Sequence, residues 1–311
     1  MKILVPDTVP LDDAAISGAT VVVYSATEPV PEEHTDAEAL VAWGNSADQL
    51  RDAAGRLTGL RWVQDLAAGP GATLSAGFAA DVPITSGRSL HDATVAEHTL
   101  ALALAAARHL HLAVRAQIGH RWAREIGGLQ PLDNSRGLTT LRDARVVVWG
   151  FGSIGKTVAP LLRALGAEVV GVARSARTVD GYQVVDDVDA VLPTADILIM
   201  ILPTAPSTDK ALDARRLALL PPAAWVVNVG RGSTVDEQAL LEALRGGRLA
   251  GAALDVTATE PLPADSPLWD EPRIIITPHA AGGRPLGAAA LIQQNLDALQ
   301  AGEPLTNLVE R

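Results

Sequence analysis

The sequence predicts an α/β protein built from two doubly wound parallel-sheet domains. Two blocks of the 311-residue chain alternate short apolar segments with helical segments, and such alternation is typical of parallel sheets covered by helices. The apolar segments are rich in Val and Ile and show little polar alternation, as expected of strands buried on both faces. A glycine-rich motif between one such strand and a helix predicts that the second block binds a nucleotide.

The predicted strands follow in order along the two blocks. In the first block they are Ile3–Val5, Thr20–Tyr24, Leu40–Trp43, Arg61–Leu66 and Val82–Thr85. In the second block they are Arg145–Trp149, Glu168–Ala173, Ile197–Leu202, Trp225–Val229, Gly251–Val256 and Ile274–Thr277. Between the blocks we predict one long helix, Ala93–Gln117, and an irregular connector, Gly119–Leu141; the final helix is Leu286–Leu299.

Composition excludes several classes of function. The net charge is −11 and no dense run of basic residues occurs, which argues against nucleic acid or an anionic membrane as a partner. The absence of cysteine excludes disulfides and thiolate metal sites, and we predict no metal site. The start of the chain does not resemble a signal peptide and Ala93–Val114 carries charged side chains, so we expect a soluble cytoplasmic protein without a membrane span.

The predicted strand Arg145–Trp149 runs directly into the motif G-F-G-S-I-G, and a helix is predicted to follow from Lys156. In this G-x-G-x-x-G pattern Gly150 permits a tight turn, Gly152 lets a pyrophosphate approach the backbone, and Gly155 lets the helix pack closely on the strand. The helix N-terminus offers free N–H groups to phosphates. A glycine-rich turn can serve chain geometry alone, but the flanking strand and helix favour dinucleotide binding.

The end of the next strand favours NADP(H) over NAD(H), although NAD(H) remains possible. Ala173 occupies the position where an acidic residue usually binds the ribose hydroxyls of NAD, and Arg174, Ser175 and Arg177 follow it. Two guanidinium groups and a hydroxyl are suited to a 2′-phosphate, which a carboxylate would repel. The alternative is an ordinary solvated basic loop.

Three polar side chains follow apolar strands of the second block, where ligands of α/β sheets bind. Arg231 lies between two glycines and could bind a carboxylate. His279 could exchange a proton with a carbonyl oxygen, and a paired Glu260 would favour the charged imidazole. Singly, they could be a surface arginine, a structural histidine and a solvated acid. Together they predict hydride transfer between a nicotinamide and a small 2-oxo acid.

Several motifs resemble those of the D-isomer-specific 2-hydroxyacid dehydrogenase family. They are G-F-G-S-I-G, N-V-G-R-G-S-T-V-D-E, L-D-V-T-A-T-E-P-L-P and S-P-L-W-D-E-P-R-I-I-I-T-P-H-A-A-G, and the similar region spans about Ala93–Gly283. The resemblance implies catalytic roles for Arg231, Glu260 and His279. It also implies a Rossmann cofactor domain (98–284) inserted in a flavodoxin-like substrate domain (1–97 and 285–311), and a homodimer formed through the cofactor domain.

The same resemblance implies further cofactor and substrate contacts. Cofactor contacts are implied for Phe151, Gly152, Ser153, Ile154, Leu202, Pro203, Thr208, Val229, Gly230, Asp255 and Gly282, with Asp255 facing the nicotinamide amide. The substrate would bind Arg231, His279 and the backbone amides of a loop best matched by Ala68 and Gly69. Pro70 in that loop lacks an N–H, and no Asp or Asn occurs in 72–77.

The R-S-A-R stretch resembles the NADPH-preferring glyoxylate and hydroxypyruvate reductases of this family, so we expect small substrates of this kind. One alternative is NAD-dependent oxidation of phosphoglycerate or phosphite, which requires another cation in the first domain, with Arg51, Arg56 and Arg88 as candidates. A more distant alternative is a nucleotide-sensing binding protein similar to the family's transcriptional corepressors.

Overall fold

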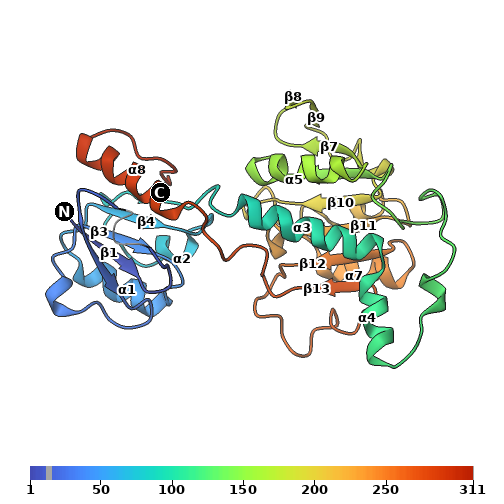
Figure 1. Ribbon diagram of the computed structural model, residues 1–311, viewed down its shortest axis with the longest axis horizontal. Coiled ribbons are helices and arrows are strands. Elements are labelled where there is room, and N and C mark those ends of the chain that lie inside the picture. Colours follow the sequence, from blue (N-terminus) through green and yellow to red (C-terminus); the bar gives the residue numbers. More distant parts are fainter. Residues whose placement is uncertain (12–15, 311) are drawn as a thin grey trace. The chain divides into compact units, whose positions relative to one another are not determined.

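The computed structural model describes residues 1–11 and 16–310, which form two compact units (Figure 1). Unit 1 comprises Met1–His91 and Arg284–Arg311, and unit 2 comprises Asp92–Gly283. The first helix of unit 2 begins at Asp92, so the chain passes from unit 1 to unit 2 slightly earlier than the sequence indicates.

Unit 1 contains a five-stranded parallel sheet in the order β2-β1-β3-β4-β5. This is the order of the flavodoxin-like fold, and it confirms the predicted fold class for this unit. The strands are β1 (Lys2–Pro6), β2 (Thr20–Tyr24), β3 (Ala39–Ala42), β4 (Trp62–Asp65) and β5 (Ile84–Thr85). The helices are α1 (Ala47–Arg56), α2 (Gly71–Leu74) and α8 (Ala288–Ala301), with a 3-10 turn, η2, at Glu32–His34.

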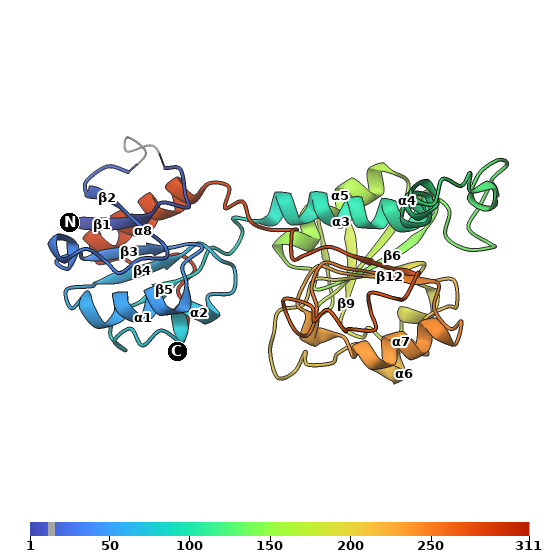
Figure 2. The same ribbon diagram turned by 90° about the horizontal axis from the view of Figure 1, so that it is seen from below.

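The sheet of unit 1 is covered on both faces, because its central strands are apolar on both sides. Figure 2 shows α8 on one face and α1 with α2 on the other. Leu291, Ile292 and Leu296 of α8 pack against one face of the sheet. The fully buried Asn295 donates from Nδ2 to Oε1 of Gln64, 231 residues earlier, at 2.8 Å. Helix α8 therefore completes a core whose strands come from the start of the chain.

Unit 2 contains an eight-stranded sheet in the order β13-β12-β11-β10-β6-β7-β9-β8, in which only the β8–β9 pairing is antiparallel. Its strand order reverses between β6 and β10, as in doubly wound dinucleotide-binding folds. The strands are β6 (Arg145–Trp149), β7 (Glu168–Val172), β8 (Arg177–Val179), β9 (Tyr182–Val185), β10 (Ile197–Met200), β11 (Trp225–Asn228), β12 (Gly251–Leu254) and β13 (Ile274–Ile276).

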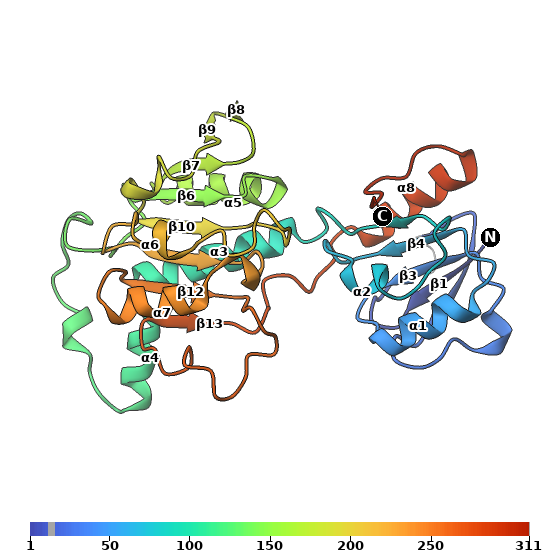
Figure 3. The ribbon, with the colours of Figure 1, turned by 180° about the vertical axis from the view of Figure 1, so that it is seen from behind.

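Helices cover both faces of this sheet. Helices α3 (Asp92–Ala107) and α5 (Ser153–Ala164) lie on the face seen in Figure 1, whereas α6 (Ala214–Leu217) and α7 (Glu237–Arg245) lie on the face seen in Figure 3. The remaining elements are α4 (Leu110–Ile118) and the 3-10 turns η3 (Arg124–Ile126), η4 (Leu192–Thr194) and η5 (Gly232–Thr234). Among the described residues, no helix is long and apolar enough to cross a membrane.

The structure differs from the predicted elements at two places in unit 2. The single helix predicted over 93–117 is wrong, because His109 adopts a left-handed φ of 52° and separates α3 from α4. The hairpin of β8 and β9 was not predicted. Its two-residue turn is Asp180-Gly181, with φ angles of 52° and 77°, which is the favoured turn chemistry for a tight hairpin.

Candidate active site

The glycine motif after β6 has the geometry that dinucleotide binding requires. Gly150 has a φ of 104°, and a Cβ there would lie 2.5 Å from the Ile201 carbonyl oxygen. A Cβ on Gly152 would meet nothing within 4 Å, whereas one on Gly155 would lie 3.0 Å from the Gly150 oxygen. The turn, the open approach and the close packing predicted for these three glycines are all present.

Helix α5 begins directly at this motif. Lys156 N–H donates to the Gly152 carbonyl at 3.0 Å, so the helical hydrogen bonds begin only after the first turn. Within residues 1–11 and 16–310, the N–H groups of Ser153, Ile154 and Gly155 have no hydrogen-bond acceptor, and such free donors at a helix N-terminus suit a phosphate. The Ser153 hydroxyl itself donates to Asp92 at 3.2 Å.

The side chain of Phe151 lies in the core rather than in a binding site. It is 1% exposed, and a Cβ added to Gly171 of β7 would lie 2.5 Å from its ring. The ring centre lies 5.8 Å from that of Tyr182. Phe151 can therefore offer a cofactor only its backbone, and its ring fixes the glycine turn against β7.

A cavity of about 770 Å³ extends from the glycine motif along the ends of β7, β9 and β10. Arg174, Ser175 and Arg177 all line it, and Arg177 donates from Nη1 to the Ser175 carbonyl at 2.9 Å. Of the predicted cofactor residues, this cavity is also lined by Gly150, Phe151, Gly152, Leu202, Pro203 and Thr208. The structure thus brings the predicted basic cluster and the glycine motif to one cavity.

Thr208 contributes to the shape of the loop after β10. Its hydroxyl donates to the Pro203 carbonyl at 2.6 Å and accepts the Ala205 N–H at 2.9 Å. Arg216 of α6 lines the same cavity and was not predicted as a site residue. No local motif marks it, because its position depends on how the 202–212 segment folds back.

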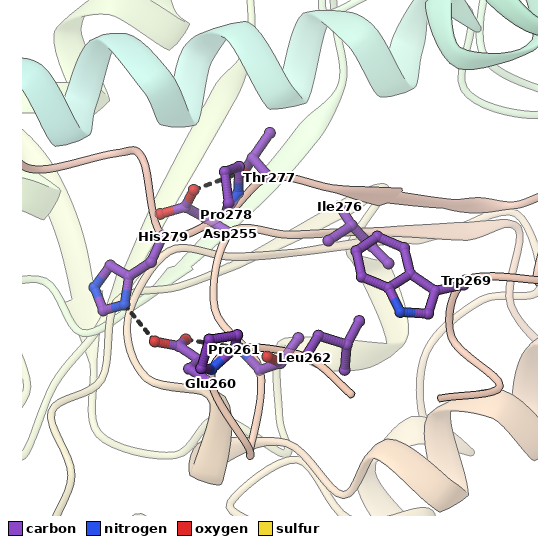
Figure 4. Close-up of a pocket in the computed structure, with 10 residues that line it drawn as sticks. Asp255, Glu260, Pro261, Leu262, Trp269, Ile276, Thr277, Pro278 and His279 are labelled. Atoms are coloured by element: carbon purple, nitrogen blue, oxygen red, sulfur yellow. Dashed lines mark hydrogen bonds and ion pairs between the residues drawn. The ribbon is translucent and has the colours of Figure 1, made fainter. Parts of the chain in front are cut away.

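His279 and Glu260 form a hydrogen-bonded pair beyond the ends of β12 and β13 (Figure 4). His279 Nδ1 lies 2.7 Å from Glu260 Oε2, and Thr257 N–H donates to Glu260 Oε1 at 3.0 Å. A carboxylate only accepts hydrogen bonds, so Nδ1 carries the proton and Nε2 is left for exchange with a ligand. The side chains are 49% and 36% exposed, which leaves both accessible.

The loop that carries His279 is held by Asp255. The buried Asp255 carboxylate accepts hydrogen bonds from the Thr277 hydroxyl at 2.6 Å, Ala280 N–H at 2.8 Å and Ala281 N–H at 3.1 Å. The Asp255 carbonyl accepts the N–H of His279 at 2.8 Å. Asp255 therefore holds the backbone of 277–281 in place. Within this segment His279 adopts a left-handed conformation with a φ of 52°.

His98 of α3 belongs to the same network and was not singled out in the sequence. Its Nε2 lies 3.0 Å from the Thr277 hydroxyl and 3.2 Å from Asp255 Oδ1. Because the Thr277 proton is donated to Asp255, Nε2 of His98 must itself carry a proton. His98 lies 179 residues before Thr277, so no spacing rule joins them.

Arg231 lies where three backbone segments pack closely. A Cβ on Gly230 would lie 2.7 Å from the backbone nitrogen of Leu202, and one on Gly232 would lie 1.9 Å from the Thr257 carbonyl carbon. The flanking glycines are therefore required by packing, and they bring the Arg231 loop against the segment that leads to Glu260. The half-buried Arg231 donates from Nη1 to the Gly230 carbonyl at 2.7 Å.

An apolar cavity of about 610 Å³ lies beside the His279–Glu260 pair. Figure 4 shows the pair on one side and Trp269 on the other, with Leu262 and Ile276 between them. Asp255 also lines this cavity. Of the other residues predicted to contact the cofactor, Val229 is buried and Gly282 is partly buried.

In unit 1, the loop after β4 presents Ala68 and Gly69 at the surface, and Gly69 lines a cavity of about 140 Å³. Beneath the loop, the buried Asp65 accepts the Ala67 N–H at 2.7 Å and the Thr73 hydroxyl at 2.5 Å. Burial raises the pKa of the Asp65 carboxyl. Asp65 shapes this loop, and no motif in the sequence marks it as a site residue.

The three arginines considered for a phosphorylated substrate already have partners in unit 1. Arg51 pairs with Asp48, and Arg56 donates to Glu32 at 2.6 Å. Arg88 donates to Asn307 at 3.2 Å. These contacts therefore direct none of the three guanidinium groups toward the loop after β4.

Comparison with known proteins agrees with this geometry. Residues 100–281 match the profile of the "D-isomer specific 2-hydroxyacid dehydrogenase, NAD binding domain". A glyoxylate/hydroxypyruvate reductase A of Escherichia fergusonii is 36% identical over 205 residues, covering 63% of this chain and 65% of that protein. The chain thus spans a little under two thirds of the length of this relative.

Two solved structures resemble nearly the whole chain. A D-isomer specific 2-hydroxyacid dehydrogenase of Xanthobacter autotrophicus, in complex with NADPH and MES, is 30% identical with a TM-score of 0.80, covering 99% of this chain and 97% of that one. An NADPH-dependent glyoxylate/hydroxypyruvate reductase of Sinorhizobium meliloti, in complex with NADP and sulfate, is 26% identical with a TM-score of 0.79, covering 99% and 98%.

Proposed function

Because the chain belongs to the D-isomer specific 2-hydroxyacid dehydrogenase family, we propose that it interconverts small 2-oxo acids and D-2-hydroxy acids with NADP(H). The observation that carries this proposal is the His279–Glu260 pair, at 2.7 Å, in the same unit as the glycine motif. Glyoxylate and hydroxypyruvate are the proposed substrates. The preference for NADP(H) rests on Arg174, Ser175 and Arg177, which line the cavity of that motif.

A bound nicotinamide supplies the hydride for reduction. His279 Nε2–H donates a proton to the substrate carbonyl oxygen, and in oxidation the neutral Nε2 accepts the hydroxyl proton. Glu260 holds Nδ1–H and stabilises the imidazolium that precedes donation. Arg231 binds the substrate carboxylate and polarises the carbonyl. The N–H groups of Ala68 and Gly69 are the proposed further donors to that carboxylate.

Asp255 acts chiefly as a positioning residue in this proposal. Both of its carboxylate oxygens already accept hydrogen bonds from the loop that carries His279. Its remaining lone pairs could also accept a hydrogen bond from the nicotinamide amide, as expected from the family. Replacement of Asp255 should therefore first disturb the position of the loop that carries His279.

The test is oxidation of NADPH and of NADH with glyoxylate, hydroxypyruvate, pyruvate and phenylpyruvate. We expect NADPH-linked reduction of the two smallest oxo acids, and a His279→Ala protein that binds NADPH normally but has lost most of its turnover. NADPH binding without turnover on any acid would contradict the proposed reaction and favour a nucleotide sensor. Turnover of phosphoglycerate or phosphite alone with NAD would favour the phosphorylated-substrate alternative.

We also propose a homodimer formed through unit 2. Leu110, Val114 and Ile118 recur every four residues on α4 and are 50%, 52% and 74% exposed, and Trp122 after the helix is 86% exposed. An apolar helical stripe of this kind is typical of a buried interface. Light scattering should show a dimer for the native protein and a monomer for Val114→Asp; a native monomer at micromolar concentration would contradict this proposal.

A further inference from the structure

A third arginine, Arg216, lines the cavity of about 770 Å³ at the glycine motif, which is the proposed cofactor cavity. This arginine and the R-S-A-R stretch belong to segments that follow different strands. Strands β7 and β10 are the two neighbours of β6, so the segments that follow them lie on either side of the glycine motif. Arg174 and Arg177 come from the β7 side, whereas Arg216 of α6 comes from the β10 side. The cavity is therefore lined by guanidinium groups from two separate segments.

Arg216 is held in one orientation by three contacts. Its Nε donates to Asp189 Oδ1 at 2.7 Å, and its Nη1 donates to the Ala211 carbonyl at 2.8 Å. The guanidinium carbon lies 5.3 Å from the ring centre of Trp149, within the range of a cation–π contact. Within residues 1–11 and 16–310, Nη2 has no hydrogen-bond partner, so one edge of a fixed planar cation is free.

Asp189 pairs with two neighbouring arginines, Arg216 and Arg215. Arg215 donates from Nη1 to Asp189 Oδ2 at 2.6 Å, so two cations share one carboxylate. Hydrogen bonds, first from Arg215 and then from Arg216, hold the pKa of Asp189 below its ordinary value. The carboxylate therefore stays ionised and holds Arg216 in place, while Asp213 and Asp187 also lie close enough to Arg215 to raise its pKa. Arg215 is exposed and does not line the cavity, which distinguishes the two neighbours.

We propose that Arg216 binds the adenine ring of the dinucleotide, with its guanidinium plane stacked against the ring. A planar cation fixed at the wall of a cavity stacks well on an aromatic base, and adenine is the aromatic, uncharged part of the ligand at this end. The 2′-phosphate is then left to Arg174 and Arg177. This inference depends on the proposed function only in that the ligand is an adenine dinucleotide.

The test is calorimetric binding of 2′,5′-ADP and of 5′-AMP to the full-length protein, which requires no turnover. Arg216→Lys keeps the charge beside Asp189 but loses the plane, so both ligands should bind about tenfold more weakly. Arg216→Gln should give at least the same loss. The matched control is Arg215→Lys, which loses the neighbouring guanidinium of the same ion cluster and should bind both ligands like the native protein.

Two results would overturn the assignment. Unchanged binding of both ligands by Arg216→Lys and Arg216→Gln would show that Arg216 only supports the fold. A loss confined to 2′,5′-ADP would place Arg216 on the phosphate instead of the base. Absence of 2-oxo acid reduction in a native protein that binds both fragments would refute the proposed reaction without affecting this inference.

Discussion

Replacing Asp255 with Asn tests how firmly the loop that carries His279 is held. The carboxylate is 2% exposed and accepts from the hydroxyl of Thr277 and the N–H groups of Ala280 and Ala281, with His98 Nε2 also 3.2 Å away. An amide keeps the shape but offers one acceptor oxygen and one NH₂ group. Whichever way the amide is oriented, its NH₂ group faces at least one of these donors.

The free energy by which Asp255→Asn destabilises the loop follows from the donor that is left unpaired. A buried donor without an acceptor costs about 1–3 kcal/mol, and the smallest loss occurs if only Ala281 N–H is affected. The amides of the loop should then exchange with solvent about ten- to a hundredfold faster, because about 1.4 kcal/mol corresponds to a factor of ten. Asp255→Ala removes every acceptor at once, so it should lower the stability of the loop by more than Asp255→Asn does, because several buried donors are left unpaired instead of one.

Hydrogen exchange followed by mass spectrometry on a peptide covering 277–283 measures this directly. The matched control is Asp270→Asn, which makes the same chemical change at an exposed aspartate. We expect faster exchange and lower turnover in the Asp255→Asn protein, with the control unchanged. Equal exchange in the two variants would refute the view that Asp255 holds this loop.

Three further perturbations have defined outcomes. Arg174→Ala with Arg177→Ala should raise the KM for NADPH about ten- to a hundredfold, since each exposed charge-assisted bond contributes about 1 kcal/mol or more; an equal rise for NADH would contradict the 2′-phosphate site. Burial lowers the pKa of His111 from 6.5 to about 4, so stability should decline as the pH falls from 6.5 toward 4; urea unfolding of His111→Phe should show a smaller decline, because burial also lowers the pKa of His109, and an unchanged decline would contradict the role of His111. Gly171→Ala should displace the Phe151 ring, lowering the unfolding free energy by about 1–3 kcal/mol and weakening NADPH binding; an unchanged urea midpoint would contradict that packing.

The parts of the site that lie next to a strand end were predictable from the sequence. A buried parallel strand is a continuous apolar run, and the residue that follows it lies at the ligand-binding edge of the sheet. That reasoning located the glycine motif, the segment from Arg174 to Arg177, and the ends of β12 and β13. The pairing of His279 with Glu260 follows from the same rule, because adjacent strands deliver them.

The parts that depend on packing between distant segments were not predictable in this way. His98 reaches Thr277 only because α3 lies against the sheet, and Arg216 reaches the cofactor cavity only because the 202–212 segment folds back onto β6. The break at His109 depends on one backbone angle within an Ala- and Leu-rich stretch whose propensity is helical throughout. The role of the Phe151 ring depends on the absence of a side chain at Gly171.

The position of α8 has a consequence for how the protein is synthesised. The sheet of unit 1 emerges early from the ribosome, but Leu291, Ile292 and Leu296, which cover one of its faces, emerge only after the whole of unit 2. Until then Ile3, Val41 and Trp62 lack those partners, and such an exposed apolar face favours aggregation or chaperone binding. Unit 2 is continuous in sequence and can complete its core first. Nascent chains that stop before α8 should therefore contain a folded cofactor-binding unit joined to an incomplete first unit.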